Sequence, residues 1–493
     1  QVPKASGPGR GEGLARMEPA PEESLGASCV QPPAGSSDGD DPGHPGQAED
    51  AWLPAQGTFA FSWSQSTKAL DVGCKPGRGD VDGDGFLAVG GLALNLKTDA
   101  AEDKVLVIGN VSATSQSHHS GSSWTLKRGA RRIGPLFQLW PGAPGMKQSL
   151  LVPWLDCPGG GKRSRLEVEY SLQVRLRDGI RLSEGQERRH LAALVLPDSQ
   201  VSSVLAHTEV VVGSERWHDV GLSQATVTGE GERVLVICAI GYRALWSDEG
   251  SRGRFTMARD GVRLDGESFG LQSVRSTGSS VGSAPAPCLV MALLDDPPAG
   301  KHLYTVRACV TPGPEQPRAL CQLGGAGEES DSRQLNLIRL PSAVVSGPFR
   351  CIGATTVTED RWTEIEGLSA SIDVRHSREK VLVIYHTNFD PAGSEYEVHI
   401  TLFRRGKLGH EENLGNENTG MWTVASRCWQ SSEYPHAVLT DSPGIGEHTY
   451  SVRARTRACG RHQDAEPAQL GPDGQIAAVL LRDCGAISLG ANR

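Results

Sequence analysis

What this sequence lacks excludes several classes of protein. The longest purely apolar runs, among them residues 288–294, are far shorter than the roughly 20 residues of a membrane-spanning helix, so we expect no transmembrane segment. The 49 basic and 58 acidic side chains give a net charge of −9 without a basic excess, so we expect no nucleic acid as partner. Aromatic side chains make up only 5 % of the chain, which argues against a sugar-binding surface of exposed aromatics.

A disulfide framework is missing as well. The 11 cysteines are odd in number and irregular in spacing, whereas a secreted framework would recur with the domain. We therefore expect mostly free thiols and leave isolated bridges open. Because no Cys-x-x-Cys pair is present, a structural zinc site is not expected.

Several common catalytic signatures are also absent. The chain has no His-Glu-x-x-His pair, no phosphate-binding loop and no dinucleotide fingerprint. We therefore predict a protein that is not an enzyme, and we name no catalytic residue and no organic cofactor.

The strongest signal that is present is the apolar run Val-Leu-Val-Ile. It occurs three times behind a basic residue, at residues 105–108, 234–237 and 381–384. These copies lie too far apart for a solenoid built from units of about 20–50 residues. They indicate instead that one type of domain occurs three times in the chain. This agrees with the length of 493 residues, which allows about three domains.

Three further landmarks recur in the same order around each run. They are an aromatic residue followed by Gly-Leu, a basic turn ending in glycine, and an Asp two residues before Pro that precedes a tyrosine strand. Glycine after a charged residue is typical of a hairpin turn. The landmark residues are Gly91, Gly221 and Gly367; Gly129, Gly261 and Gly406; Asp156, Asp295 and Asp441; and Tyr170, Tyr304 and Tyr450.

These patterns predict an all-β protein of three tandem antiparallel β-sandwich domains with jelly-roll-like order. The 60 glycines and 30 prolines fit such a turn-rich chain. The predicted boundaries are a low-complexity tail at 1–57 and sandwich repeats at 58–197, 198–341 and 342–493. The tail is so poor in large apolar residues that it cannot offset its ordering entropy, so we expect it to be disordered or extended.

The order of the landmarks resembles that of receptor-binding tip domains of phage tail fibres and related virion proteins. It is also similar to the trimeric jelly rolls that include tumour necrosis factor-like and complement-type globular heads. The residues that carry the resemblance are 380–384, 402–406 and 441–452, with Pro443, His448, Thr449 and Tyr450. The resemblance covers roughly residues 58–493, and it implies a sandwich that works as a threefold trimer.

A threefold arrangement could also form within this one chain. In a sandwich whose outer sheet faces water, alternate strand residues should be polar, but all four residues of each Val-Leu-Val-Ile run are apolar. Something must therefore cover the outer face. Another copy of the domain would make the protein a pseudo-trimer, and a long loop is the alternative.

One segment of the first repeat has the pattern of a calcium loop. Asp80, Asp82 and Asp84 stand at alternate positions closed by glycine, which is how a loop presents oxygen ligands to Ca²⁺. Ala88 and Gly91 stand where related loops place a further acid, so a solvated acidic hairpin is the alternative. The overlapping Arg-Gly-Asp at 78–80 is the tripeptide that integrins recognise, although so short a match is common.

Other polar groups recur along the chain. Asp, His and Tyr repeat as 295, 302 and 304 and as 441, 448 and 450, and we interpret them as structural rather than as an acid–base set. Rows of arginine on the tyrosine strands could instead dock an acidic partner or an anionic sugar, although cross-strand ion pairs are the ordinary explanation. The candidate interaction residues are Arg175, Arg177, Arg453, Arg455 and Arg457.

The sequence thus favours a non-catalytic structural or interaction protein. Three rigid modules would act as a scaffold or accessory subunit among other protein subunits of a larger assembly. A carbohydrate- or receptor-binding adhesion protein, with a glycan as partner, is the alternative, and an enzyme of unknown class comes third. No charged-then-apolar leader follows Gln1, so an organelle lumen and the extracellular surface both stay open.

Overall fold

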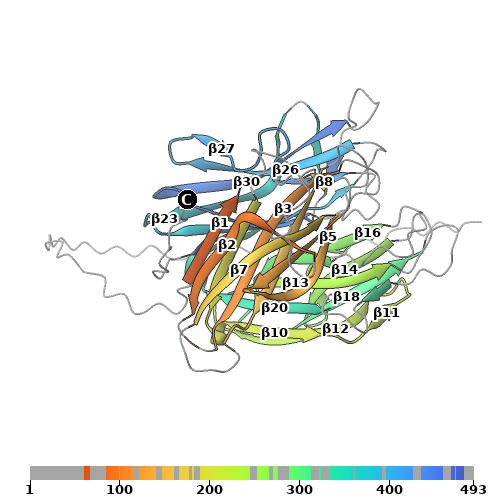
Figure 1. Ribbon diagram of the computed structural model, residues 1–493. Helices are drawn as coiled ribbons and strands as arrows, with labels where there is room; N and C mark the ends of the chain where they lie inside the picture. The colour runs from red at the N-terminus through yellow and green to blue at the C-terminus, as the bar shows by residue number, and fades with distance from the viewer. Residues whose placement is uncertain are drawn as a thin grey trace, which may run out of the picture. The chain divides into compact units, whose positions relative to one another are not determined.

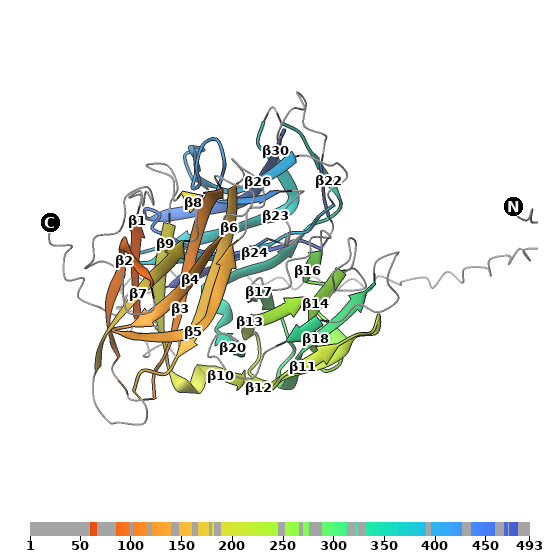
Figure 2. The ribbon, with the colours of Figure 1, turned by 45° about the vertical axis from the view of Figure 1, so that its right-hand side comes forward.

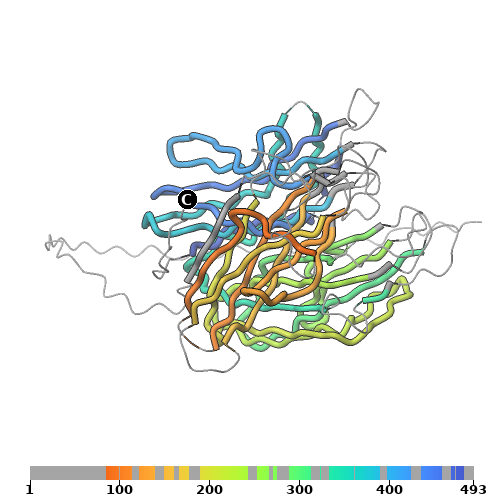
Figure 3. The backbone as a smooth tube through the Cα atoms, in the orientation of Figure 1, coloured from red at the N-terminus to blue at the C-terminus, as the bar shows by residue number. Residues whose placement is uncertain are grey.

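The computed structural model describes most of the chain from residue 60 to residue 481, and Figure 3 draws most of those residues in colour. Residues 55–493 form one compact unit. The described ranges are 60–66, 85–98, 100, 102–115, 121–139, 147–159, 166–176, 180–181, 189–244, 252–265, 270–275, 288–312, 321–323, 332–359, 361–390, 396–425, 435–458, 468–471 and 473–481.

The first sandwich consists of two antiparallel sheets, drawn in red to yellow in Figure 1. One sheet has the order β1-β9-β3-β6, with β8 beside β3, and the other has the order β2-β7-β4-β5. The strands are β1 (Ala60–Ser66), β2 (Leu87–Thr98), β3 (Lys104–Ser115), β4 (Ser122–Arg128), β5 (Arg131–Leu139), β6 (Lys147–Asp156), β7 (Leu166–Leu176), β8 (Ile180–Arg181) and β9 (Arg189–Leu196).

The second sandwich begins after the short 3-10 turn η1 (Asp198–Gln200) and repeats this order. Its sheets are β10-β20-β13-β17, which β19 and β11 extend from β13, and β12-β18-β14-β15 with β16 beside β14. The strands are β10 (Val201–Ala206), β11 (Val210–Val212), β12 (His218–Thr228), β13 (Arg233–Ala244), β14 (Arg252–Arg259), β15 (Val262–Arg263), β16 (Gln272–Arg275), β17 (Cys288–Asp295), β18 (Gly300–Thr311), β19 (Cys321–Leu323) and β20 (Arg333–Leu340).

The third sandwich follows a second turn, η3 (Ser342–Val344). Its sheets are β21-β32-β24-β29 and β23-β30-β26-β27, with β28 beside β26, and a small sheet β22-β31-β25 completes it. The strands are β21 (Val345–Arg350), β22 (Thr355–Val357), β23 (Thr363–Val374), β24 (Lys380–His386), β25 (Phe389–Asp390), β26 (Tyr396–Gly406), β27 (Glu411–Asn413), β28 (Trp422–Ala425), β29 (His436–Asp441), β30 (Gly446–Ala458), β31 (Ala468–Leu470) and β32 (Gln475–Leu481).

All three sandwiches have the strand order of a jelly roll. With β8, β11, β16, β19, β22, β25, β28 and β31 set aside, the eight remaining strands of each sandwich pair in the orders first-eighth-third-sixth and second-seventh-fourth-fifth. The predicted fold class of three tandem antiparallel sandwiches is confirmed. Within the described ranges, no helix has the length and hydropathy needed to span a membrane.

The recurrent Gly-Leu landmark marks a β-bulge. Gly91, Gly221 and Gly367 have φ values of 80°, 72° and 83°, and each lies where β2, β12 or β23 shifts register against its partner strand. Glycine reaches positive φ at little cost, which is why it stands in the bulge. A Cβ on Gly367 would come within 2.4 Å of the Arg350 carbonyl oxygen, so this glycine also permits a close backbone approach.

The Val-Leu-Val-Ile runs lie in β3, β13 and β24, and none of their residues is more than 1 % exposed. In β13, Val234 and Val236 belong to the core of the second sandwich. Leu235 and Ile237 point the other way, into an apolar cluster that also contains residues of the first and third sandwiches. The outer face is therefore covered, and the neighbouring sandwiches cover it.

Contacts between strands of different sandwiches show where this covering occurs. The edge strand β17 packs against β24 and β29 of the third sandwich and against β5 and β6 of the first (Figure 2). Strand β29 in turn packs against β3 and β6. The strands that flank the central apolar runs thus meet at the junctions between sandwiches.

Candidate functional site

An arginine, an aspartate and a tyrosine meet at one end of every sandwich. One oxygen of the aspartate accepts hydrogen bonds from both the guanidinium and the phenol. The distances to arginine and tyrosine are 2.9 and 2.8 Å in Arg128–Asp156–Tyr170, 2.7 and 2.7 Å in Arg259–Asp295–Tyr304, and 2.7 and 2.8 Å in Arg404–Asp441–Tyr450. We call these the Arg–Asp–Tyr clusters.

The strand register explains why the cluster recurs. Arg259 ends β14 and stands directly opposite Tyr304 in β18, and the same pairing joins the arginine and tyrosine of the other two clusters. Asp295 ends β17, in the facing sheet. Each cluster therefore connects the two sheets of a sandwich, at the end of the sandwich where the Asp-Pro turn begins.

Burial sets the charge state of the clusters. Burial first, and then the neighbouring aspartate, raises the pKa of Tyr170, Tyr304 and Tyr450, so the phenols stay protonated and donate. The aspartates accept from two donors at once. Because the arginine, aspartate and tyrosine of each cluster are hydrogen-bonded to one another, a structural role is favoured over a role in acid–base chemistry.

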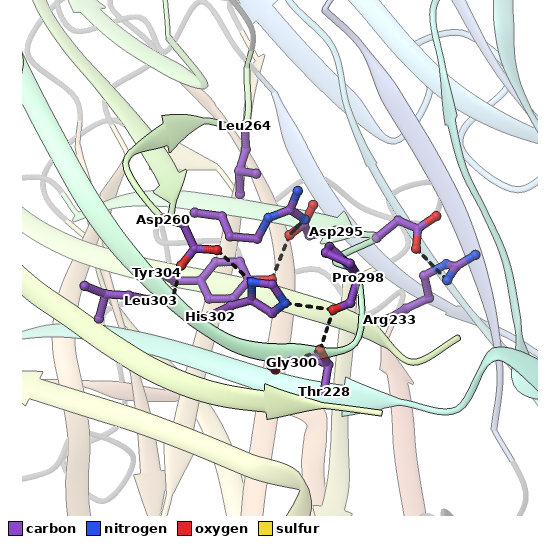
Figure 4. A network of polar contacts seen from close by, with 12 residues as sticks. Thr228, Arg233, Asp260, Leu264, Asp295, Pro298, Gly300, His302, Leu303 and Tyr304 are labelled. Atoms are coloured by element: carbon purple, nitrogen blue, oxygen red, sulfur yellow. Dashed lines mark hydrogen bonds and ion pairs between the residues drawn. The ribbon is translucent and has the colours of Figure 1, made fainter. Parts of the chain in front are cut away.

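The histidine of the Asp-His-Tyr pattern does not face the aspartate of the cluster (Figure 4). His302 Nδ1 lies 2.7 Å from Asp260 Oδ2, and its Nε2 lies 2.7 Å from the Pro298 carbonyl oxygen. His448 Nε2 contacts the Gly444 carbonyl in the same way, at 2.7 Å. The histidine therefore pins the turn after the aspartate, which agrees with the structural interpretation of the pattern.

The junctions between sandwiches contain a second set of polar side chains, which sequence reasoning missed. Strands β6, β17 and β29 are sheet edges within the described residues, and side chains of another sandwich bind their backbone groups. Gln334 of β20 accepts from Leu155 N at 3.0 Å and donates to Leu155 O at 2.9 Å. Gln475 of β32 accepts from Leu294 N at 2.9 Å.

Histidine and asparagine complete this set. His436 Nδ1 lies 3.1 Å from Ala292 N, and its Nε2 lies 2.8 Å from Leu271 O, so a third-sandwich side chain binds two backbone sites of the second. Asn110 of β3 donates to Val438 O of β29. The first sandwich is thus bound by the second, the second by the third, and the third by the first. We call these side chains the junction caps.

The predicted arginine rows lie mostly within internal contacts. Arg453 pairs with Glu411 at 2.8 Å and lies 4.2 Å from the Phe403 ring centre, and its hydrogen bond lowers the pKa of Glu411. Arg455 and Arg175 stack on Trp362 and Phe86 at 4.7 and 5.0 Å. Arg457 is exposed, and Arg177 lies outside the described residues. Arg453, Arg455 and Arg175 thus make contacts within the sheet surface, and the docking of an acidic partner or an anionic sugar by these arginines stays a prediction.

The structure provides less information on the remaining candidate sites. Asp80, Asp82 and Asp84, with the overlapping Arg-Gly-Asp, lie outside the described residues, so the calcium loop stays a prediction. Elsewhere in the described ranges, no group of three His, Cys, Asp or Glu side chains could hold a metal ion. The cysteines whose state is described are free thiols: Cys157, Cys238, Cys288, Cys309 and Cys351.

No model of a known protein family matches the chain, and no characterised protein matches it in sequence. Among solved structures, PNGase F, a glycosylasparaginase from Flavobacterium meningosepticum, is similar at 9 % identity over 57 % of this chain and 96 % of that one, with a TM-score of 0.28. A protein with the triple jelly roll fold, from the turret assembly of an archaeal virus, is similar at 7 % identity over 84 % of this chain and 91 % of that one, with a TM-score of 0.16.

Scores this low carry no argument about function. The jelly-roll part of the predicted resemblance rests on the strand order of the three sandwiches. The likeness to tail-fibre tips and to tumour necrosis factor-like heads stays a prediction.

Proposed function

We propose that this chain is a non-catalytic structural or interaction protein, a scaffold or accessory subunit of a larger assembly. Its three sandwiches would form one rigid, pseudo-threefold body, and other protein subunits would be its partners. The observation that carries the proposal is the cyclic pattern of junction caps, in which each sandwich binds the edge strand of another.

Edge strands give the physical reason. An unpaired edge offers a row of backbone donors and acceptors to any passing strand, which is a route to aggregation. Here β6, β17 and β29 present their edges to other sandwiches of the same chain, and Gln334 and Gln475 occupy part of the backbone groups. This arrangement supports a body whose inner edges are internally protected, which leaves the outer sheets and loops for partners.

The apolar surface at the junctions supports rigidity. Leu106, Leu235 and Leu382 of the three central strands are each at most 1 % exposed and share one cluster. Burying a leucine side chain contributes about 1.5–3 kcal/mol. Separating the sandwiches would expose many such side chains together, so domain motion would be costly.

The experiment is purification of the native protein under mild conditions, followed by cross-linking and mass spectrometry of what co-purifies. We expect defined protein subunits, cross-linked to outer sheets rather than to the strands β6, β17 and β29. A chain recovered alone and monomeric would refute the assembly role. Cross-links from a partner to Gln334 or Gln475 would refute the internal protection of the edges.

A further inference from the structure

A groove of about 310 Å³ lies between the second and third sandwiches. Its walls come from the β14–β15 hairpin, from the end of β17 and from β21. Leu264 and Pro348 give it apolar surface, and Figure 4 shows Leu264 beside the Arg–Asp–Tyr cluster of the second sandwich. A volume of this size falls at the lower end of the range for small-ligand pockets.

Three arginines line the groove, and their charges are compensated unequally. Arg259 is bound to Asp295 at 2.7 Å. Arg263 stacks on Trp217 with its guanidinium 5.2 Å from the ring centre. Arg350 is exposed, and within the described residues its one hydrogen bond is a 3.5 Å contact to the Leu264 carbonyl oxygen. Arg350 is therefore the cation best placed to receive an anion.

The carboxylates near the groove are already engaged. Asp295 serves Arg259 and Tyr304, and Asp296 lies 2.6 Å from Arg233. Asp265 lies 3.5 Å from Arg263 and accepts a hydrogen bond from Thr256 at 2.8 Å, and burial raises the pKa of its carboxyl group. The groove thus combines the exposed guanidinium of Arg350 and the partly exposed one of Arg263 with Asp296, whose side chain is 52 % exposed and can accept further hydrogen bonds.

We propose that this groove binds a uronic acid, a sugar ring that carries a carboxylate. The carboxylate would lie between the guanidinium groups of Arg350 and Arg263, because the planar fork of arginine matches a carboxylate. Ring hydroxyls would donate to Asp296, and the C–H face of the ring would pack on Leu264 and Pro348.

The mixture of charges in the lining favours a uronic acid over an inorganic anion or an acidic peptide. Asp295 and Asp296 repel any anion, and a bare inorganic anion has no hydrogen-bond donor for Asp296 that would offset this repulsion, whereas the sugar hydroxyls do. An acidic peptide runs extended and uses a long groove, whereas this one is compact. A ring that bears both an anion and hydroxyl donors uses the whole lining.

Titration calorimetry with D-glucuronate, D-glucose, inorganic sulfate and N-acetyl-L-glutamate tests the proposal on the full chain. We expect glucuronate to bind best. Arg350→Gln should weaken it about tenfold or more, since a charge-assisted hydrogen bond contributes about 1.5–3 kcal/mol. Arg375→Gln, at a 67 % exposed arginine paired with Asp373, is the matched control and should change nothing.

Val262→Glu is a second variant, since Val262 is 71 % exposed and lines the groove. The added carboxylate should repel glucuronate. No glucuronate binding below about 10 mM, equal binding of glucose, or unchanged binding in both groove variants would overturn the proposal. Tighter binding of sulfate or of N-acetyl-L-glutamate would also overturn it, in favour of a general anion site or an acidic peptide. None of these outcomes would contradict the proposed scaffold role, which the co-purification experiment tests separately.

Discussion

The Arg–Asp–Tyr cluster of the second sandwich makes a sharp prediction about stability. Asp295→Asn removes the charge that holds Arg259 and keeps the size of the side chain. The Asp295 side chain is 7 % exposed and that of Arg259 is 25 % exposed. Removing one partner of a fully buried pair costs about 3–5 kcal/mol, and because water reaches Arg259, we expect about 2 kcal/mol here.

The neighbouring aspartate supplies a matched control. Asp296 is 52 % exposed and pairs with Arg233, so Asp296→Asn removes a surface ion pair one residue away. Exposed pairs contribute at most about 1 kcal/mol. The two variants make the same substitution at aspartates that differ in burial and in the second donor, Tyr304, which binds Asp295.

Hydrogen exchange read by mass spectrometry is the right assay, because unfolding of a three-sandwich chain need not be two-state. Peptides covering β17 and β18 should lose protection in Asp295→Asn and keep it in Asp296→Asn. Tyr304→Phe should cost about 1.5 kcal/mol, and the double variant should cost less than the sum, because both donors bind one carboxylate. Equal protection in the two aspartate variants would refute the view that the cluster holds the sheets together.

Three other substitutions follow from the junctions. Gln475→Ala should lower hydrogen-exchange protection of Leu294 by about 1–3 kcal/mol, because its buried N–H loses its acceptor. Burial lowers the pKa of His436 below 6.5, the value expected in the unfolded chain. The free energy of unfolding should therefore fall as the pH drops below 6.5, because the unfolded chain then binds a proton that the folded protein does not. His436→Gln should make this fall smaller, as measured by the midpoints of urea unfolding between about pH 8 and pH 5. Leu235→Ala should cost about 2–5 kcal/mol in urea unfolding, whereas Val227→Ala, at a 60 % exposed valine, should cost little.

Local patterns were enough to find the elements of this fold. The alternation of residues in the tyrosine strands, the glycines at the bulges and the Asp-Pro turns each depend on a few neighbouring residues, so they can be read from the sequence. The Val-Leu-Val-Ile runs also predicted tertiary packing, because a strand with two apolar faces must be covered on both faces. That expectation holds for all three runs.

The sequence also revealed two of the three members of each Arg–Asp–Tyr cluster. Aspartate and tyrosine were visible as a recurrent pair, but the histidine between them looked like the third member. The arginine that takes that place lies 28 to 37 residues before the aspartate, in another strand. Only the register of β4, β14 and β26 against their partners brings it into contact.

By itself, the sequence determined that this protein is three all-β sandwiches with a buried outer face. Which surface covers that face was decided only by the tertiary structure. The junction caps join residues far apart in the chain, 179 positions for Gln334 and Leu155 and 181 for Gln475 and Leu294. Gln334 and Gln475 stand at the equivalent position of their closing strands, but this recurrence does not reveal their partners, because a backbone donor looks the same at every residue.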